Sequence, residues 1–359
     1  MDFHGGNIYR YNNTNLIDFS SNINPLGIPY IFKKKLIDNL DVLTRYPDIH
    51  YKKMRETIGS YLGVDNFNSV IPGNGAVEII YKTLLALDIE EVLIAAPTFA
   101  QYRIAAGLKK IPYEEVVVYM ENGKFLKEKL LEKINNLPNK SLVIICNPNN
   151  PTGTLIPLET IEIIAQKLIK KKGYLLLDEA FIEFTDNYPV SSMVKNLKNY
   201  QNIIIIRAAT KFFGIPGIRL GYGVSENELL INKIKGIMEP WNVNALAVLA
   251  GETIFLDKNY IKDSRKWIRK EKVFFERNLE KLSKVIYLNS QANFILLKIK
   301  DMEAQKVKKM LLQRNILIRT LEGFTGIDQN YFRVAIKDRR NNEYFFQKLK
   351  EVIFHESNS

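Results

Sequence analysis

Short apolar runs alternate with longer amphipathic segments between about residue 68 and residue 225 of this 359-residue chain. The apolar runs have the length of strands, and in the segments between them apolar residues recur about every 3.6 positions. Strands joined by crossover helices form a parallel sheet, and strands that are apolar on both sides fit a sheet covered by helices. The pattern predicts an α/β fold. We expect strands at Val92–Ala95, Glu115–Tyr119, Leu142–Cys146, Tyr174–Asp178, Ile203–Arg207 and Leu220–Val224, and helices at Val77–Leu87 and Leu158–Lys171.

A different pattern begins after Asn244. A charged amphipathic stretch at 259–282 is followed by strand candidates at Asn293–Ile299, Ile316–Arg319 and Phe332–Ala335 and by a closing helix, which predicts a smaller α+β lobe. With 46% apolar residues, the chain can bury one large core and a minor one. We expect an N-terminal segment (1–40) packed with the small domain and the active site, a large domain (41–245) and a small domain (246–359).

Charge and cysteine content argue against several classes of protein. The net charge is +12, but the lysines are spread along expected helix faces without a nucleic-acid-binding motif, so we expect no nucleic-acid partner. Because no run of about 18 apolar residues occurs and residues 1–10 lack the order of a signal peptide, we expect a cytoplasmic protein without a membrane partner. The one cysteine, Cys146, lies in an apolar run, and we expect a buried thiol without a role and no metal site.

Unusual residues follow the expected strands at their carboxyl ends, where ligands bind in open α/β sheets. Gly73–Ala76 precedes a helix whose first N–H groups suit a phosphate. The sequence NPNNPTG, residues 147–153, follows the strand that ends at Cys146. Asp178 ends another apolar strand, where a carboxylate is costly unless a cation is its partner.

Lys211 follows a further apolar strand and precedes two phenylalanines. A lysine in such surroundings is a candidate for a desolvated amine whose pKa is low enough for imine formation. Arg219 lies eight residues later, is always charged, and suits a bidentate contact with a phosphate. The residues at the strand ends therefore predict a site with one reactive amine and at least one phosphate.

In this order, the glycine turn, Asn150, Asp178, Lys211 and Arg219 resemble the fold-type-I pyridoxal 5′-phosphate (PLP) enzymes of the aminotransferase class I/II family. The resemblance runs nearly end to end. It implies a mostly parallel seven-stranded sheet between helices in a large domain, plus a smaller α+β domain. It also implies that Lys211 holds PLP as a Schiff base, that Asp178 keeps the pyridine nitrogen protonated, that Asn150 contacts the phenolic oxygen and that Arg219 binds the phosphate. A protonated pyridine ring is an electron sink for a carbanion at the substrate Cα.

The same resemblance assigns further cofactor contacts. Phe99 matches the aromatic residue that stacks on the cofactor ring, and Gly75 and Ala76 belong to the phosphate turn. Ala208 stands where relatives carry a hydroxyl residue, so one phosphate contact is expected to be missing, with Thr210 or water as its substitute. Tyr46 resembles the tyrosine that relatives lend to the cofactor phosphate of a neighbouring subunit, which implies a homodimer.

The expected substrate contacts come from both ends of the chain. Arg333 matches the arginine that binds an anionic substrate group, and Arg319 matches a second one in relatives that recognise phosphate. Near the N-terminus, the sequences HGGN (residues 4–7) and DFSSNINPLG (residues 18–27) resemble the threonine-phosphate decarboxylases of the family. We hypothesise that His4, Asn24, Arg319 and Arg333 together bind a substrate phosphate.

Two subgroups of the family, the threonine-phosphate decarboxylases and the histidinol-phosphate aminotransferases, resemble this chain. The N-terminal motifs, and Phe181 in place of the usual tyrosine, favour decarboxylation of O-phospho-L-threonine to (R)-1-aminopropan-2-yl phosphate in cobalamin biosynthesis, with Lys211 as the proton donor after CO₂ loss. The alternatives are a histidinol-phosphate aminotransferase that uses glutamate and 2-oxoglutarate, and an O-phospho-L-serine decarboxylase that gives ethanolamine phosphate. A regulator without catalysis is disfavoured, since Lys211 is intact and such regulators append a DNA-binding domain for which this chain has no room.

Overall fold

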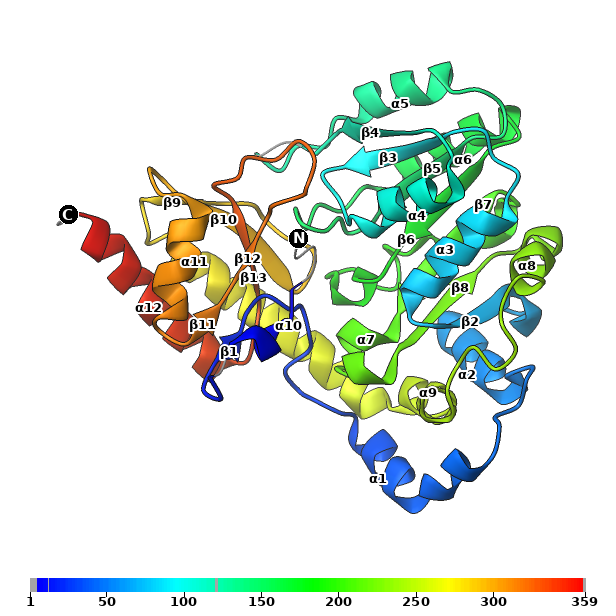
Figure 1. Cartoon of the computed structure of the whole chain (residues 1–359), viewed down its shortest axis with the longest axis horizontal. Coiled ribbons are helices and arrows are strands. Elements are labelled where there is room, and N and C mark those ends of the chain that lie inside the picture. The colour runs from blue at the N-terminus through cyan, green and yellow to red at the C-terminus, as the bar shows by residue number, and fades with distance from the viewer. Residues whose placement is uncertain (1–4, 12, 120–121, 358–359) are drawn as a thin grey trace.

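The computed structural model describes residues 5–11, 13–119 and 122–357. A seven-stranded sheet forms the centre of the larger lobe (Figure 1). Its strands are β2 (Val70–Asn74), β3 (Val92–Ala96), β4 (Tyr113–Val117), β5 (Leu142–Cys146), β6 (Tyr174–Asp178), β7 (Ile203–Ala208) and β8 (Leu220–Val224). They are arranged in the order β2-β8-β7-β6-β5-β3-β4. The strand β8 pairs antiparallel with both of its neighbours, and all other pairs are parallel. The prediction of a mostly parallel seven-stranded sheet is confirmed.

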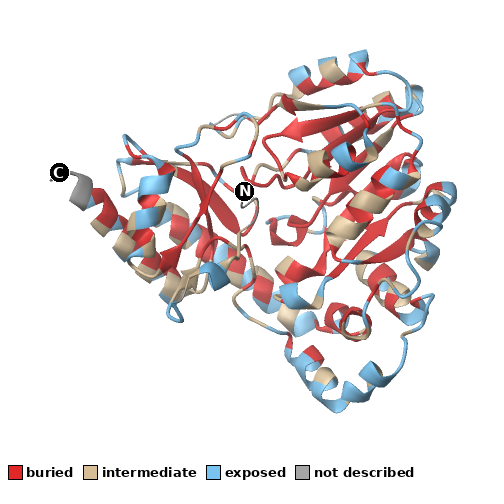
Figure 2. Ribbon diagram, viewed as in Figure 1, coloured by how far each residue is buried: buried red, intermediate tan, exposed pale blue. Residues whose placement is uncertain are grey.

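Helices cover both faces of this sheet, as the apolar strands require. One face packs against α3 (Ala76–Ala86), α4 (Gln101–Lys109) and α8 (Glu228–Lys235), and the other against α5 (Lys127–Asn136) and α6 (Leu158–Lys170). Alternate residues of β5 enter the two cores: Leu142 and Ile144 one, Val143 and Ile145 the other. Figure 2 shows the strands as buried and the outer sides of these helices as exposed.

The larger lobe and its flanks contain further helices. They are α1 (Tyr30–Asp38), α2 (Lys52–Leu62), α7 (Ala209–Phe212) and α9 (Ala245–Gly251). In the described part of the chain, no helix combines the length and the apolar character needed to cross a membrane.

The smaller lobe contains a four-stranded sheet in the order β12-β13-β10-β9. Its strands are β9 (Val285–Tyr287), β10 (Phe294–Ile299), β12 (Arg319–Thr320) and β13 (Phe332–Ala335), and its helices are α10 (Lys258–Leu279), α11 (Ala304–Leu312) and α12 (Arg339–Ser357). The strand β1 (Ile17–Asp18) pairs in parallel with β11 (Ile316–Leu317), so residues 17 and 18 join the smaller lobe. The domain limits at residues 40 and 245 stay a prediction.

Three elements differ from the sequence prediction in their presence, in their pairing, or in their bounds by more than one residue. The strand β2 was not predicted, because Pro72 and Gly73 weaken a strand pattern; β2 lies at the sheet edge, where a missing N–H is tolerated. The strand β4 begins two residues before the predicted start, since Tyr113 pairs with Val92. The run Ile316–Arg319 forms two strands in two sheets, because its first residues pair with β1 and Arg319 pairs with β13.

Cationic side chains of α10 connect the two lobes through main-chain oxygens. Arg269 Nη2 donates to the carbonyl of Asp186 at 2.8 Å, and Lys272 Nζ donates to that of Phe184 at 3.0 Å. Arg265 donates to the carbonyl of Tyr188. The three cations lie on one face of α10, because residues three or four positions apart share a helix face.

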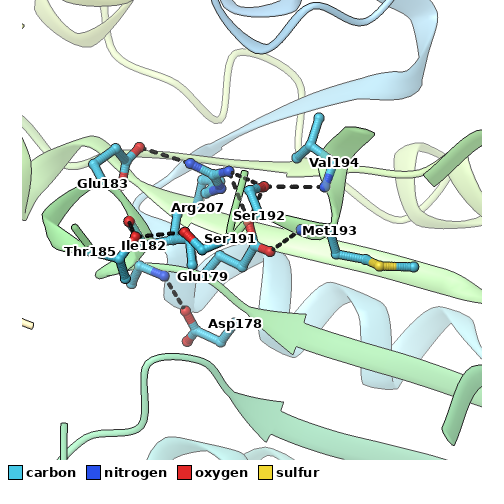
Figure 3. Close-up of polar contacts among 11 residues, drawn as sticks. Asp178, Glu179, Ile182, Glu183, Thr185, Ser191, Ser192, Met193, Val194 and Arg207 are labelled. Carbon is cyan, nitrogen blue, oxygen red and sulfur yellow. Dashed lines mark hydrogen bonds and ion pairs between the residues drawn. The ribbon is translucent and has the colours of Figure 1, made fainter. Parts of the chain in front are cut away.

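A buried ion cluster fixes the ends of β6 and β7 (Figure 3). The Arg207 guanidinium lies 2.8 Å from Glu179 Oε2 and 3.0 Å from Glu183 Oε1, and all three side chains are almost completely buried. Ser192 Oγ donates to Glu179 at 2.9 Å and accepts from Arg207 at 2.8 Å. Burial raises the pKa of Glu183. The cluster therefore joins residues directly after Asp178 to the residue that precedes Ala208.

We predict that Arg207→Met lowers the free energy of unfolding by about 3–5 kcal/mol, because it leaves Glu179 buried without its cation. Urea unfolding followed by circular dichroism measures this change. The control Lys140→Met removes one cation from the exposed pair with Asp88 and should leave the unfolding midpoint unchanged. Equal effects of the two substitutions would contradict the structural role of the cluster.

Candidate active site

A cavity of about 470 Å³ lies at the carboxyl ends of the parallel strands, with walls from both lobes. This is the sheet edge at which the unusual residues were expected. The structure brings most of the predicted site residues to the wall of this one cavity: Ala76, Phe99, Asn150, Asp178, Thr210, Lys211, Arg219, Arg319 and Arg333. Gly75 directly precedes Ala76 and is the cap of α3. His4 lies outside the described residues.

Asp178 ends β6 and is 4% exposed. Its Oδ2 accepts from Tyr102 Oη at 2.7 Å, and its Oδ1 accepts from the main-chain N–H of Ala180 at 2.9 Å. Burial raises the pKa of Asp178, which means that the ionised form lacks full compensation. Among the described residues no ion-pair partner is recorded for this carboxylate. A protonated pyridine nitrogen would supply the missing cation, so Asp178 fits PLP.

Lys211 lies in α7, directly after β7. Burial, Arg333 and Arg219 lower the pKa of Lys211 to about 8. A larger fraction of the amine is therefore neutral near neutral pH than in an exposed lysine, and a neutral amine is the form that attacks an aldehyde. Lys211 also fits PLP, as the residue to which its aldehyde would bind.

The beginning of α3 packs closely against β8 and Arg219. A Cβ atom on Gly75 would lie 2.4 Å from Arg219 Nη2, and one on Gly221 would lie 2.1 Å from the Ala76 nitrogen. Gly75 and Arg219 both have left-handed backbone angles, with φ of 80° and 62°. The close approach places a guanidinium beside the N-terminus of an 11-residue helix. Such an arrangement fits the phosphate of PLP.

Ala208 and Thr210 lie on the cavity wall close to this end. Ala208 offers no hydroxyl, in agreement with the sequence, whereas Thr210 is buried and carries one. Phe99 also lies on the wall, with its ring edge-on to that of Tyr102 at 5.7 Å between centroids. The thiol of Cys146 reaches the wall too, and burial raises the pKa of this thiol.

Two arginines of the smaller lobe face each other across paired strands. Arg319 of β12 is the register partner of Arg333 of β13, and each is 6% exposed. Arg333 Nη2 donates to the Ser20 carbonyl at 2.8 Å, Nη1 donates to Asn150 Oδ1, and the guanidinium lies 5.2 Å from the Phe294 ring centroid. Burial and the charge of Arg319 lower the pKa of Arg333. Like charges directly opposite are destabilising, so this pair calls for an anion.

The structure places Asn24 away from the cavity wall. Its side-chain amide donates to the Phe212 carbonyl at 2.7 Å and to Ser264 Oγ at 2.8 Å, and its oxygen accepts from Leu26. Asn22 lies on the wall instead, and its Oδ1 is buried without a hydrogen-bond partner among the described residues. Asn22 rather than Asn24 thus lies on the wall, and the substrate contact expected of Asn24 stays a prediction.

Further residues of the wall were not predicted. They are Gly5, Ser20 and Ser21 of the N-terminal segment, Val77 and Ile80 of α3, Gln101 of α4, and Phe324 of the loop between β12 and β13. The Arg319 guanidinium lies 6.0 Å from the Phe324 ring centroid, and in the same loop Thr325 Oγ1 donates to Glu115 of β4 at 2.7 Å. This loop reaches the larger lobe (Figure 1) and contributes Phe324 to the cavity wall. Such a loop has no regular spacing of apolar residues, so its position could not be predicted from the sequence.

Tyr46 is 75% exposed and stacks on Trp241 with 4.4 Å between ring centroids. It is not among the residues of the cavity wall in its own chain. Its predicted contact with the cofactor of a neighbouring subunit stays a prediction.

Comparison with known proteins agrees with this geometry. Residues 14–349 match the model of the family aminotransferase class I and II. The chain is 33% identical to the threonine-phosphate decarboxylase of Salmonella typhimurium over 98% of this chain and 96% of that protein. It is 39% identical, over 97% of this chain and 93% of the relative, to a Caldanaerobacter subterraneus protein assigned as a threonine-phosphate decarboxylase.

A solved structure is similar as well. The crystal structure of the histidinol-phosphate aminotransferase from Clostridium acetobutylicum has a TM-score of 0.88 and 38% identity, with coverage of 94% of this chain and 99% of that chain. Coverage of this extent includes parts of both lobes. The chain therefore belongs to the aminotransferase class I and II family, and it is a PLP-dependent enzyme with the fold-type-I architecture that its sequence predicts.

Proposed function

We propose that this enzyme decarboxylates a phosphorylated amino acid, O-phospho-L-threonine, to (R)-1-aminopropan-2-yl phosphate and CO₂, in cobalamin biosynthesis. The observation that carries the proposal is the facing pair of buried arginines, Arg319 and Arg333, on the wall that also holds Lys211. Two guanidinium groups suit the doubly charged phosphate of this substrate better than a single carboxylate. The near-full-length similarity to two threonine-phosphate decarboxylases supports the same assignment.

The residues of the larger lobe supply the chemistry. When bound, PLP provides an electron sink for the pair that CO₂ leaves on the substrate Cα. Asp178 keeps a positive charge at the pyridine nitrogen, because its own carboxylate is buried and needs a cation. Lys211 holds the proton that returns to Cα, and its lowered pKa favours release of that proton.

The residues of the smaller lobe decide which Cα bond breaks. A bond breaks most easily when it stands perpendicular to the cofactor ring. If Arg319 and Arg333 hold the substrate phosphate, no arginine of this pair remains to hold the α-carboxylate in the ring plane. The carboxylate is then free to stand perpendicular, which favours loss of CO₂ over loss of a proton. Asn22 Oδ1 lies on the wall without a hydrogen-bond partner among residues that the structure describes, and it can accept a hydrogen bond from the substrate.

Transamination of histidinol phosphate is the second candidate. The arginine pair would bind the phosphate of that substrate equally well, and the Clostridium acetobutylicum structure supports this alternative. Phe181 argues against it, since it gives the cavity wall an aromatic ring without a hydroxyl. Decarboxylation of O-phospho-L-serine is a third candidate, because one methyl group changes affinity by only about 1–3 kcal/mol.

The product formed from each substrate tests the proposal. We expect the holoenzyme to release CO₂ and an amino-alcohol phosphate from O-phospho-L-threonine, faster than from O-phospho-L-serine, and to form little glutamate from histidinol phosphate and 2-oxoglutarate. Mass spectrometry of the products measures all three reactions. The variant Lys211→Ala should lose both the reaction and the visible absorption band of the bound cofactor. Glutamate as the main product would reject decarboxylation and favour the aminotransferase.

We predict that Arg333→Ala raises KM for O-phospho-L-threonine at least about thirtyfold, as expected for the loss of one partner of a buried charged contact. Arg333→Lys keeps the charge but not the bidentate geometry and should have an intermediate KM. Steady-state kinetics with a CO₂ assay measure both variants. The control Arg314→Ala removes an arginine that pairs with Glu351 away from the cavity. An unchanged KM in Arg333→Ala would remove the assigned role.

We also propose that the enzyme is a homodimer in which Tyr46 contacts the cofactor phosphate of the other subunit. Large apolar side chains are exposed throughout residues 26–49, next to Trp241: Leu26, Ile28, Tyr30, Ile31, Ile37, Leu40, Leu43, Tyr46 and Ile49. Figure 2 shows the segment around α1 as largely exposed. Exposed apolar surface of this kind is typical of an interface.

The cytoplasmic location expected from the sequence stays a prediction.

Mixed dimers test this arrangement. We expect Tyr46→Ala to weaken PLP binding about tenfold, because one hydrogen bond to a charged phosphate is lost. When Tyr46→Ala and Lys211→Ala chains are co-expressed, the mixed dimer should contain one intact site and recover activity. Activity and PLP affinity of the purified mixed dimer are measured. If Tyr46 serves its own chain, mixing restores nothing.

A further inference from the structure

We propose that Asp18 is a positioning residue of this active site. Its carboxylate fixes the Ser20–Asn22 turn, and through that turn the N-terminal segment and Arg333, and it is also the counter-charge of the cations around Lys211. Asp18 belongs to the N-terminal motif, yet none of the roles described above uses it. It does not line the cavity and is half-buried behind the wall, at the end of β1.

The first part of the proposal rests on hydrogen bonds. Asp18 Oδ1 accepts from the Ser20 N–H at 2.8 Å and from Ser20 Oγ at 2.5 Å, and Oδ2 accepts from Ser21 Oγ. One carboxylate therefore holds two consecutive residues of the turn in place. The turn presents Ser20, Ser21 and Asn22 to the cavity.

Ser20, held by Asp18, in turn contacts Arg333 and the N-terminal segment. Its carbonyl accepts from Arg333 Nη2 at 2.8 Å, which fixes the guanidinium that faces Arg319. Its hydroxyl accepts from the Gly6 N–H at 2.8 Å. Gly5 approaches the same residue so closely that an added Cβ atom would lie 2.1 Å from the Ser20 carbonyl oxygen. Asp18 thereby positions both a substrate arginine and the N-terminal segment on the wall.

The second part rests on charge. Arg333 of β13 is buried, and Lys211 of α7 and Lys337, two residues after β13, are half-buried. The charge of Asp18 raises the pKa of each, against the lowering caused by burial. Arg219 at the start of β8 and Arg319 of β12 add two more positive charges that act on Lys211 and Arg333. In this group the charge of Asp18 is the one that opposes the lowering of the Lys211 pKa. Removal of the carboxylate would therefore make Lys211 a weaker base.

The charge is tested on Lys211 itself, without substrate. Full-length protein without cofactor is acetylated over a range of pH, and mass spectrometry follows the Lys211 peptide. The wild-type midpoint is expected near the pKa of about 8. In Asp18→Asn the midpoint should move to lower pH, because the protonated amine loses a stabilising negative charge. Ser20→Ala and the exposed Asp263→Asn on α10 should keep the wild-type midpoint.

The position is tested by proteolysis of the holoenzyme. Arg10 is exposed and is the first trypsin site of the chain. We expect release of residues 1–10 to become about tenfold faster in Asp18→Asn and Ser20→Ala, the factor expected from loss of a hydrogen bond to a charged group. Cleavage should also become faster in Gly5→Ala, because the added Cβ would clash with the Ser20 carbonyl. Asp263→Asn should be cleaved at the wild-type rate. Gly5→Ala changes no charge, so its Lys211 midpoint should stay that of the wild type.

The outcomes separate the proposal from a merely structural role. If Asp18→Asn keeps the wild-type Lys211 midpoint, or keeps the wild-type cleavage rate, the proposal is overturned. If Asp18→Asn does not fold, Asp18→Glu replaces it: the charge is kept and the side chain lengthened, so the midpoint should stay near that of the wild type while cleavage becomes faster. A wild-type cleavage rate in Asp18→Glu and in Ser20→Ala overturns the proposal too. Neither readout uses a substrate, so failure of the proposed decarboxylation would leave this test intact.

Discussion

The buried carboxylate of Asp178 is the constraint around which the active site is arranged. It ends a strand whose preceding residues, Leu175 to Leu177, are completely buried, so its charge has little solvent to stabilise it. The hydrogen bonds from Tyr102 and Ala180 offset part of the free energy lost by burying the ionised carboxylate, and a cationic ligand must offset the rest. Because helices cover both faces of the sheet, such a ligand can reach the carboxylate only beyond the strand ends. The site therefore lies where the sheet stops.

A second charge problem lies directly behind the first. Glu179 follows Asp178 and is completely buried, and its negative charge would raise the cost of ionising Asp178. Arg207 neutralises Glu179 from the neighbouring strand. The cavity itself has the opposite problem, since cations from both lobes converge on it. Phosphate groups of cofactor and substrate relieve the repulsion among these cations. We therefore expect ligands bound in the cavity to stabilise the folded protein.

Local pattern was sufficient to predict most of the fold and many of the residues that the structure places on the cavity wall. The apolar runs of β5, β6, β8 and β13 match their observed bounds, because burial on both faces, or pairing within a small sheet, dictates apolar residues there. Asn150, Asp178 and Lys211 were singled out because they lie at or shortly after the ends of β5, β6 and β7. The edge strand β2 was missed, since Pro72 is tolerated only where a sheet ends.

Contacts between distant segments could not be predicted in this way. The pairing of Arg207 with Glu179 and Glu183 joins two strands and a turn, and no sequence period reports such neighbours. The position of Asn22 rather than Asn24 on the wall depends on the path of the segment that carries both, which no sequence pattern reports. The facing of Arg319 and Arg333 was expected only because both resembled family residues. Their register across β12 and β13 came from the structure.

The junction formed by α10 has a consequence for how the chain can change by mutation. Arg265, Arg269 and Lys272 bind main-chain carbonyls of residues 184–188, and every residue type carries such a carbonyl. Replacement of the Asp186 carboxylate or the Tyr188 ring would leave those acceptors in place. The connection between the lobes thus depends on the course of the backbone more than on the identity of the side chains along it. The exposed positions of this segment, Asp186 and Asn187, can therefore accept substitutions while the carbonyl contacts between the lobes are kept, whereas Phe184 is completely buried.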